Sequence, residues 1–338
     1  MPGDVSAEGN PVIKDTLASR SFSVGPVEVS PALLLAPMSG VTGRAFRRMI
    51  KTENPEAVGL VVTEFISVEG LTRGNAKSLR MMEYSEIEHP VSVQIFGYDI
   101  DRMIEGARIA EEAGAHIVDI NCGCPAPKVV KRGGGCELMR QPDHLGKILS
   151  AVVKAVSVPV TMKMRSGWDN QTRNAVEIAH IAEDCGVGMI TVHARTRSEL
   201  YRGQPDWQIV ADVVDAVSIP VVGSGDIVDK DSADQALQSG VSGLMIGRGA
   251  MMNPWIFREL ISGQSPEKTV TQVAGVLRSY LQLLADEVPE KAYLGKMKQF
   301  VSQVTRLIDG AGPVRKELCR TTSLSEFLRI VAEWEERA

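Results

Sequence analysis

Eight short apolar runs, each ending in polar or glycine residues, recur along the first three quarters of the chain. They lie at 32–38, 60–65, 91–97, 116–123, 159–165, 189–195, 220–226 and 243–249. Each run is apolar on both faces of an extended chain, which is typical of parallel strands that helices cover. The pattern therefore predicts eight buried parallel strands.

Amphipathic helices are predicted between these runs. Apolar residues recur at three- and four-residue intervals at 101–114, 142–156, 174–186 and 207–217, the period of a helix with one buried face. Eight strand–helix units over about 220 residues fit an α/β fold of the (β/α)8 TIM barrel type. A doubly wound open sheet is the alternative, but it normally has fewer strands, and no G-x-G-x-x-G follows the first run.

The two ends of the chain depart from this repeat. Residues 1–20 show neither strand nor helix pattern and are predicted to be a flexible lead-in. Two short alternating runs around a Gly-Pro turn at 22–29 predict a hairpin that closes the bottom of the barrel. After residue 261 only helical periods remain, so we predict a barrel at 21–261 and a helical domain at 262–338.

Composition adds limits on location and partners. No apolar run reaches the roughly 18 residues of a membrane helix, the N-terminus lacks a secretory pattern, and five cysteines in 338 residues favour the reducing cytoplasm. The net charge of −5 does not indicate nucleic-acid binding unless a local basic patch exists. Such an excess lies at 291–320, and it fits either a solvated face or a surface for a phosphate backbone.

In barrels of this kind, active sites lie at the carboxyl ends of the strands. The last two runs end in Gly-Ser-Gly-Asp and Ile-Gly-Arg-Gly, at 223–226 and 246–249. Glycines bring backbone N–H groups close to an anion, and Arg248 can bind phosphate oxygens in a bidentate manner. We interpret these loops as a phosphate site, the alternative being plain tight turns.

Two further strand-end residues suggest which phosphate compound binds. Lys163 lies inside an apolar run, where a buried ammonium needs a negative partner, and a reduced flavin offers one at its N1/C2=O edge. Gln94 carries a donor and an acceptor on one amide, which suits a pyrimidine edge. Either residue alone is also compatible with a plain rim position. Together with the phosphate loops they predict flavin mononucleotide (FMN) across the barrel top.

Three of the five cysteines fall at 122, 124 and 136. A closed zinc or iron–sulfur site needs about four ligands, so we predict no metal. A Cys122–Cys124 disulfide would close a strained ring. Cys124 follows a strand end and precedes a proline, which places it above the barrel mouth, whereas Cys122 and Cys136 are expected to serve packing.

The segments APMSGVTGRAFR, VQIFG, DINCGCPAPKVVKRGGGCELM, VTMKMRSGW, VHARTR, GSGDI and MIGRGAMMNPWIF occur in this order. In this the chain closely resembles the bacterial tRNA-dihydrouridine synthases, in particular their B-type subfamily, from about residue 21 into the C-terminal helices. The resemblance implies an oxidoreductase that uses FMN and NADPH to reduce the C5=C6 bond of D-loop uridines in tRNA, with position 17 favoured. It also implies a cytoplasmic enzyme, and we expect a monomer.

The resemblance assigns roles to residues of this chain. Cys124 is the expected proton donor to uracil C5, while flavin N5 delivers hydride to C6. The expected FMN contacts are Pro37, Met38, Ser39, Gln94, Lys163, His193, Ser224, Gly225, Asp226, Gly247 and Arg248. Candidate contacts with the substrate base or the tRNA are Asn121, Lys128, Lys131, Arg132, Arg165, Arg195, Lys296, Lys298, Arg315 and Lys316. The barrel is then the FMN-binding catalytic domain, and the helical domain binds tRNA.

The chain departs from the family pattern at two positions. Ser224 stands where the family often has asparagine, which puts one ribityl contact in doubt, and Cys122 stands where methionine is common. Two other functions remain as alternatives: an FMN-dependent reductase of a free pyrimidine or enone, and a flavin-containing RNA-binding module without catalysis. The locally basic helical tail disfavours the first, and Cys124 disfavours the second.

Overall fold

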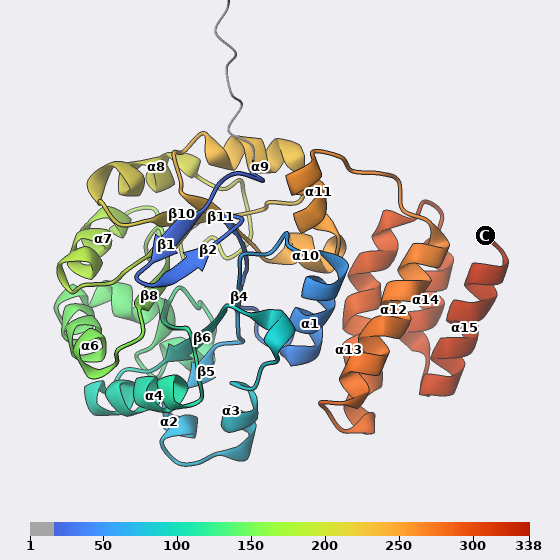
Figure 1. Ribbon diagram of the computed structural model, residues 1–338, viewed down its shortest axis with the longest axis horizontal. Helices are drawn as coiled ribbons and strands as arrows, with labels where there is room; N and C mark the ends of the chain where they lie inside the picture. The colour runs from blue at the N-terminus through green and yellow to red at the C-terminus, as the bar shows by residue number, and fades with distance from the viewer. Residues whose placement is uncertain (1–16) are drawn as a thin grey trace, which may run out of the picture.

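The computed structural model of the protein describes residues 17–338. A closed ring of parallel strands forms its centre (Figure 1). The ring consists of β3 Leu33–Leu35, β4 Leu60–Val62, β6 Val91–Phe96, β7 Ile117–Cys122, β8 Val160–Arg165, β9 Ile190–His193, β10 Val221–Ser224 and β11 Gly243–Ile246. Strand β11 pairs with β3, and β4 pairs with both β3 and β6, which closes the barrel. The predicted eight-stranded barrel is confirmed, and an open sheet is excluded.

The second strand is shorter than its apolar run. It ends at Val62, and a separate strand β5, Ile66–Ser67, pairs with the end of β6. Between the two, the Thr63 hydroxyl accepts the backbone N–H of Gln94 at 3.1 Å. A side-chain oxygen thus replaces the main-chain acceptor of the ladder, and the strand pairing is interrupted at this point.

The predicted hairpin is also confirmed. Strands β1 Phe22–Val24 and β2 Val27–Val29 pair in antiparallel fashion. Val24 and Val29 are fully buried against residues of the barrel interior, among them Ile117 and Met189 near the starts of β7 and β9. The hairpin therefore closes the end of the barrel opposite to the strand carboxyl ends.

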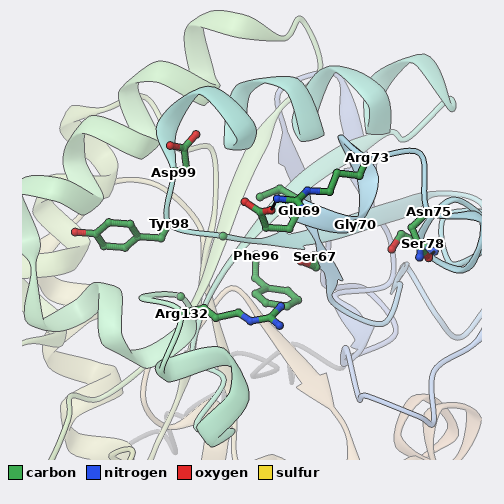
Figure 2. A pocket seen from close by; sticks show the side chains of 13 residues that line it. Ser67, Glu69, Gly70, Arg73, Asn75, Ser78, Phe96, Tyr98, Asp99 and Arg132 are labelled. Carbon is green, nitrogen blue, oxygen red and sulfur yellow. Dashed lines mark hydrogen bonds and ion pairs between the residues drawn. The ribbon is translucent and has the colours of Figure 1, made fainter.

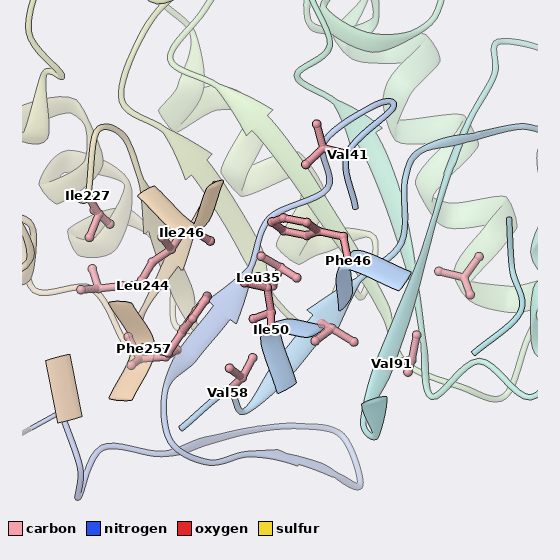
Figure 3. Packing of buried hydrophobic residues seen from close by; sticks show 14 of the residues in the cluster. Leu35, Val41, Phe46, Ile50, Val58, Val91, Ile227, Leu244, Ile246 and Phe257 are labelled. Carbon is pink, nitrogen blue, oxygen red and sulfur yellow. The ribbon is translucent and has the colours of Figure 1, made fainter. Parts of the chain in front are cut away.

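Helices surround the barrel. The long ones are α1 Arg44–Glu53, α4 Ile100–Glu112, α6 Pro142–Ala155, α7 Ala175–Asp184, α8 Trp207–Ala216 and α9 Lys230–Leu237. Short helices are α2 Val68–Leu71, α3 Ala76–Arg80, α5 Pro127–Val130, α10 Arg248–Met252 and α11 Ile256–Ser262. Outward-facing strand residues such as Leu35, Leu244 and Ile246 pack against helix residues such as Ile50 and Phe257 (Figure 3). The main core is thus the layer between strands and helices.

Four further helices form a bundle beside α1 (Figure 1). They are α12 Val270–Ala285, α13 Glu290–Val304, α14 Gly312–Arg320 and α15 Leu324–Glu336. Phe46 of α1 meets Tyr280 and Phe300 edge-on, with ring centroids 6.1 and 6.0 Å apart. Arg48 adds an ion pair to Glu287 at 3.4 Å. Since the apolar core continues through these rings, the bundle packs directly on the barrel.

Residues 1–16 of the predicted lead-in lie outside the described residues. Between residues 17 and 338, no helix combines the length and the apolar character that crossing a bilayer requires. The same range contains no group of three or more His, Cys, Asp or Glu side chains able to hold a metal ion.

Candidate active site

A cavity of about 900 Å³ opens at the carboxyl ends of the barrel strands. Thirteen of the residues predicted for the site line it: Pro37, Met38, Ser39, Asn121, Cys124, Lys163, Arg165, His193, Ser224, Gly225, Asp226, Gly247 and Arg248. They lie at or just after the ends of β3, β7, β8, β9, β10 and β11, far apart in the sequence. The barrel therefore brings together most of what the sequence predicted separately.

Lys163 and His193 both line the cavity from the paired strands β8 and β9, where Arg165 is the register partner of His193. Burial, and then the neighbouring guanidinium of Arg165, lower the pKa of Lys163 to about 8. Burial also lowers the pKa of His193 well below its usual value, and the cationic Lys163 adds to this shift. The buried Nε2 of His193 has no hydrogen-bond partner in the described part of the chain. A neutral imidazole nitrogen and a lysine ammonium are therefore available in the cavity to bind a polar ligand.

A cationic corner follows strands β10 and β11. The Asp226 carboxylate bridges the guanidinium groups of Arg195 and Arg248. Burial acts to raise the pKa of Asp226, but the hydrogen bond from Arg195 and the charge of Arg248 outweigh it, and the net shift is downward. Arg248 stacks on the ring of Tyr201 at 4.3 Å and keeps 45% of its side chain exposed. This corner carries two cations against one carboxylate, which suits a phosphate.

The backbone of this corner depends on Gly225, whose φ is +154°. A Cβ at this position would lie 3.1 Å from Pro205 and 3.4 Å from Ala194. We expect Gly225→Ala to lower the free energy of unfolding by about 1–3 kcal/mol, because the backbone conformation is strained for any other residue. Thermal and urea unfolding measure the change.

Gly275→Ala serves as control, because Gly275 lies in α12 with no atom within 4 Å of the added Cβ. It is expected to stabilise the protein by up to ~1 kcal/mol. An equal loss of unfolding free energy in both variants would contradict the special role of Gly225.

Cys124 is the one cysteine of the described chain that lines the cavity. Its thiol is mostly buried, and burial raises its pKa above the usual value, so the thiol stays protonated at neutral pH. All five cysteines are free. Cys122 packs in the layer between strands and helices, in line with its expected packing role. Cys136 donates its S–H to the Gly123 carbonyl at 3.1 Å, which supports its predicted structural role.

Hydrogen bonds on both sides hold the peptide before Cys124. The side-chain oxygen of Asn121 accepts the N–H groups of Gly123 and Cys124 at 3.1 and 2.9 Å. Arg165 Nε donates to the Gly123 carbonyl at 3.1 Å. Its Nη1 donates to the carbonyls of Thr196 and Leu200 in the loop after β9. Arg165 was predicted as a substrate contact, and it also supports the loop that carries the thiol.

Two predicted residues lie below the cavity. Gln94 is fully buried, does not line the cavity, and has its amide bound to Asp119 and Asn121. Arg195, predicted as a tRNA contact, is 1% exposed. Its guanidinium binds Asp226 and the carbonyls of Arg202 and Gly203. Arg195 thus supports the cationic corner from inside the fold, and its guanidinium is not exposed for the predicted contact with tRNA.

Several cavity residues were not predicted from the sequence. These are Phe65, Leu200 and Tyr201 from barrel loops, and Gln299 and Gln303 from α13. The four-residue spacing of the two glutamines places them on one helix face. Nothing in the sequence indicates that this face borders the barrel mouth, because that depends on the packing of α12 and α13 against α1.

The predicted tRNA residues fall into two groups. Lys128, Lys131 and Arg132 are exposed on α5 and the turn that follows it. Arg132 reaches into a second hollow of about 720 Å³, where its side chain lies below Phe96 and opposite Glu69 and Arg73 (Figure 2). Phe96 also packs edge-on against the cavity residue Phe65, with ring centroids 5.4 Å apart. The two hollows are therefore neighbours at the same end of the barrel.

The second group belongs to the bundle. Lys316 is exposed, whereas Lys298 and Arg315 are half-buried. Lys296 donates to the Gly40 carbonyl at 2.5 Å and thereby joins α13 to the loop after β3. The ammonium of this predicted tRNA contact is therefore also a link between the bundle and the barrel.

Comparison with known proteins matches residues 34–337 to the family described as "Dihydrouridine synthase (Dus)". The chain is 43% identical over 240 residues to "tRNA-dihydrouridine synthase B" of Xanthomonas campestris pv. campestris, covering 71% of each chain. It is 45% identical over 240 residues to the protein of the same name from Shewanella oneidensis, covering 71% of this chain and 74% of that one. A "Probable tRNA-dihydrouridine synthase" of Rickettsia bellii is 39% identical over 278 residues, covering 80% and 84%.

Similar solved structures share the barrel. An NCR variant from Zymomonas mobilis matches with a TM-score of 0.54 and 17% identity over 76% of this chain and 94% of that one. A morphinone reductase mutant in complex with tetrahydroNAD matches with a TM-score of 0.54 and 12% identity over 74% and 91%. At these identities the likeness concerns the fold alone.

Proposed function

This chain belongs to the dihydrouridine synthase family, and on that premise we propose that it reduces the C5=C6 bond of D-loop uridines in tRNA, with FMN as bound cofactor and NADPH as reductant. It is an oxidoreductase acting on CH–CH bonds, and the relatives' names point to tRNA as its substrate. The observation that carries the proposal is the Cys124 thiol at a cavity that also holds a lysine, an imidazole nitrogen without a partner among the described residues, and the cationic corner.

The cavity residues fit FMN in size, polar partners and phosphate donors. The volume of about 900 Å³ lies within the usual range for cofactor sites. His193 Nε2 has no hydrogen-bond partner in the described part of the chain, and the polar edge of a flavin ring would supply one. Lys163 can pair with negative charge on the flavin. Gly225, Gly247 and Arg248 offer backbone and guanidinium donors to the phosphate, with Ser224 and Asp226 beside them. Pro37, Met38 and Ser39 would contact the ring.

When bound, FMN supplies the hydride for the reaction. The protein's part is to give a proton to uracil C5, and we assign this role to the Cys124 S–H because it is the thiol that lines the cavity. Burial keeps this thiol protonated, and the charge of Arg165 acts on its pKa in the opposite direction, toward the thiolate. Arg165 is thus suited to stabilise the anion that remains on Sγ after proton transfer.

The uridine of a folded tRNA must leave its stack to enter this cavity. The basic residues Lys128, Lys131 and Arg132 adjoin the Cys124 loop, and Lys298, Arg315 and Lys316 lie on the bundle. We propose that both groups bind the tRNA backbone around the cavity, and that Asn121 and Arg165 contact the flipped base. The bundle then orients the tRNA and selects the uridine, for which position 17 is our proposal. We also propose that the enzyme is cytoplasmic and monomeric.

A deletion strain tests the function directly. Dihydrouridine is mapped in all tRNAs of the strain with and without this chain, and we expect one D-loop position to lose and regain the modification. Restoration at no position would overturn the proposal. Reduction of free uracil or an enone without action on tRNA would instead assign a small-molecule reductase.

Neutralising two cations beside the Cys124 loop is expected to weaken tRNA binding. For Lys131→Ala/Arg132→Ala we predict a slope of log K against log[salt] that is smaller by about 1.4–1.8, since each phosphate contact adds roughly 0.7–0.9. Filter binding or fluorescence titration over a range of salt concentrations measures it. The matched pair Lys147→Ala/Lys154→Ala, exposed on α6, should leave the slope unchanged, and equal slopes for both pairs would refute the contact.

A further inference from the structure

A chain of hydrogen bonds runs through the barrel interior to the Cys124 loop. The Thr161 hydroxyl donates to Asp119 Oδ1 at 2.5 Å, and Gln94 Nε2 donates to Asp119 Oδ2 at 2.6 Å. Asn121 Nδ2 in turn donates to Gln94 Oε1 at 2.7 Å. Asn121 Oδ1 then accepts the N–H groups of Gly123 and Cys124. We call Thr161, Asp119, Gln94 and Asn121 the buried amide chain.

The direction of these bonds follows from the backbone. Gly123 and Cys124 present N–H groups, which can only donate, so the oxygen of the Asn121 amide must face them. Its NH2 group must then face Gln94, which turns the Gln94 oxygen toward Asn121 and the Gln94 NH2 group toward Asp119. A group that accepts is required at position 119, and a carboxylate accepts on both oxygens.

The surroundings make each of these bonds costly to lose. The side chains of Gln94 and Thr161 are fully buried, and Asp119 and Asn121 are 4% and 5% exposed. A buried polar group that loses its partner has no water to replace it, so the full desolvation cost of that group remains. Burial raises the pKa of Asp119, while the bonds from Thr161 and Gln94 act to lower it. The mechanism proposed above uses neither Asp119 nor Thr161.

From this geometry we infer that Asp119 is a positioning residue, which fixes the orientation of two amides and thereby holds the backbone of Cys124 at the cavity. Its role in proton donation rests on the proposed function; its role in holding the loop does not. Gln94 acts in the same chain and transmits the orientation from below the cavity.

The direction of the chain gives it a distinctive test. In Asn121→Asp, position 121 no longer donates, so two acceptors face each other somewhere between residues 119 and 121 until a proton is taken up. In Asp119→Asn/Asn121→Asp the chain can run in reverse. The new amide at position 119 donates to Gln94, and Gln94 donates to the new carboxylate at position 121. That carboxylate still accepts the N–H groups of Gly123 and Cys124, so every group of the double variant again has a partner.

Three measurements are made on the purified full-length protein. These are dihydrouridine formation, the rate at which iodoacetamide alkylates Cys124, and the midpoint of thermal unfolding. For Asn121→Asp we expect dihydrouridine formation to fall about 10- to 100-fold at pH 7.5, a changed alkylation rate, and partial recovery in mild acid. For Asp119→Asn/Asn121→Asp we expect at least a tenfold recovery of dihydrouridine formation at pH 7.5 and an alkylation rate nearer to the wild-type rate than that of Asn121→Asp.

Two variants separate bond direction from simple charge repulsion. Asp119→Ala/Asn121→Asp removes the facing carboxylate but supplies no donor, so it should recover far less than the double variant with asparagine. Asp119→Asn alone should lose no more than about fivefold, because the Thr161 hydroxyl can turn and accept. Both double variants carry the same carboxylate at position 121 in the cavity, so their difference reports the chain alone.

The inference would be overturned if the losses of activity in Asn121→Asp and Asp119→Asn simply added up in the double variant. It would also be overturned if alanine and asparagine at position 119 restored the activity of Asn121→Asp equally. If the alkylation rates follow the expected pattern while even the wild type forms no dihydrouridine, the positioning role stands and the proposed function fails.

Discussion

Cys124→Ala is expected to reduce the rate of dihydrouridine formation by about 10²- to 10⁴-fold, the usual contribution of a positioned general acid. The thiol is the one sulfur of a described cysteine that lines the cavity, and its raised pKa keeps it protonated at neutral pH. Flavin binding and oxidation of NADPH should persist, because neither uses this proton. Single-turnover assays on tRNA, together with flavin absorbance during reduction, measure the two half-reactions separately.

Cys185→Ala is the matched control, since Cys185 lies at the end of α7 and donates to the Gly146 carbonyl, outside the cavity. Its activity on tRNA should equal that of the wild type. If Cys124→Ala keeps wild-type activity, another group donates the proton. If it loses the flavin, the fall in activity has a structural origin.

Lys163→Met is expected to slow flavin reduction and turnover by roughly 10- to 100-fold, because a charge-assisted hydrogen bond to a buried ligand is worth about 1.5–3 kcal/mol. The same change should stabilise the flavin-free protein. Burial, then Arg165, lower the pKa of Lys163 from 10.5 to about 8. Below pH 8 the folded protein therefore holds a cation that the unfolded chain solvates better.

The pH dependence gives this prediction its sign. Between about pH 8 and 10.5 the unfolded chain binds more protons at this site than the folded one, so wild-type stability rises with pH in that window. The stability advantage of Lys163→Met is thus largest below pH 8 and shrinks toward pH 10.5. Urea unfolding at several pH values measures it. A variant less stable than the wild type at pH 7 would show that Lys163 is already well paired without FMN.

The barrel could be predicted because its signals are local. Each strand is an apolar run and each helix an amphipathic period, and a closed ring follows from eight such units. Cys124, Lys163 and the glycine loops could be identified since strand ends in this fold converge at one mouth. The interrupted second strand escaped prediction, because it depends on a side chain: the Thr63 hydroxyl, in place of a backbone carbonyl, accepts the Gln94 N–H of the neighbouring strand β6.

The support of the site depended on contacts that sequence patterns do not specify. Arg195 carries the same charge as a surface arginine, and only the fold shows it buried under Asp226. In the sequence, Asp119 is only one acidic residue inside an apolar run. Its role becomes clear from the fold, where the amides of Gln94 and Asn121 need an acceptor at this position. Gln299 and Gln303 reach the cavity through packing between α1 and α13, two segments that lie far apart in the sequence.

The link between α13 and the loop after β3 limits how such an enzyme can be rebuilt. Gly40 is held through its carbonyl by Lys296 and through its N–H by Glu64, next to the cavity residues Met38 and Ser39. The bundle is therefore no detachable module, since Gln299 and Gln303 of α13 form part of the cavity wall. A chimera that takes its bundle from a relative must also inherit a compatible Gly40 loop and α1 face. Changes in tRNA choice are consequently expected to arise by paired substitutions across this contact.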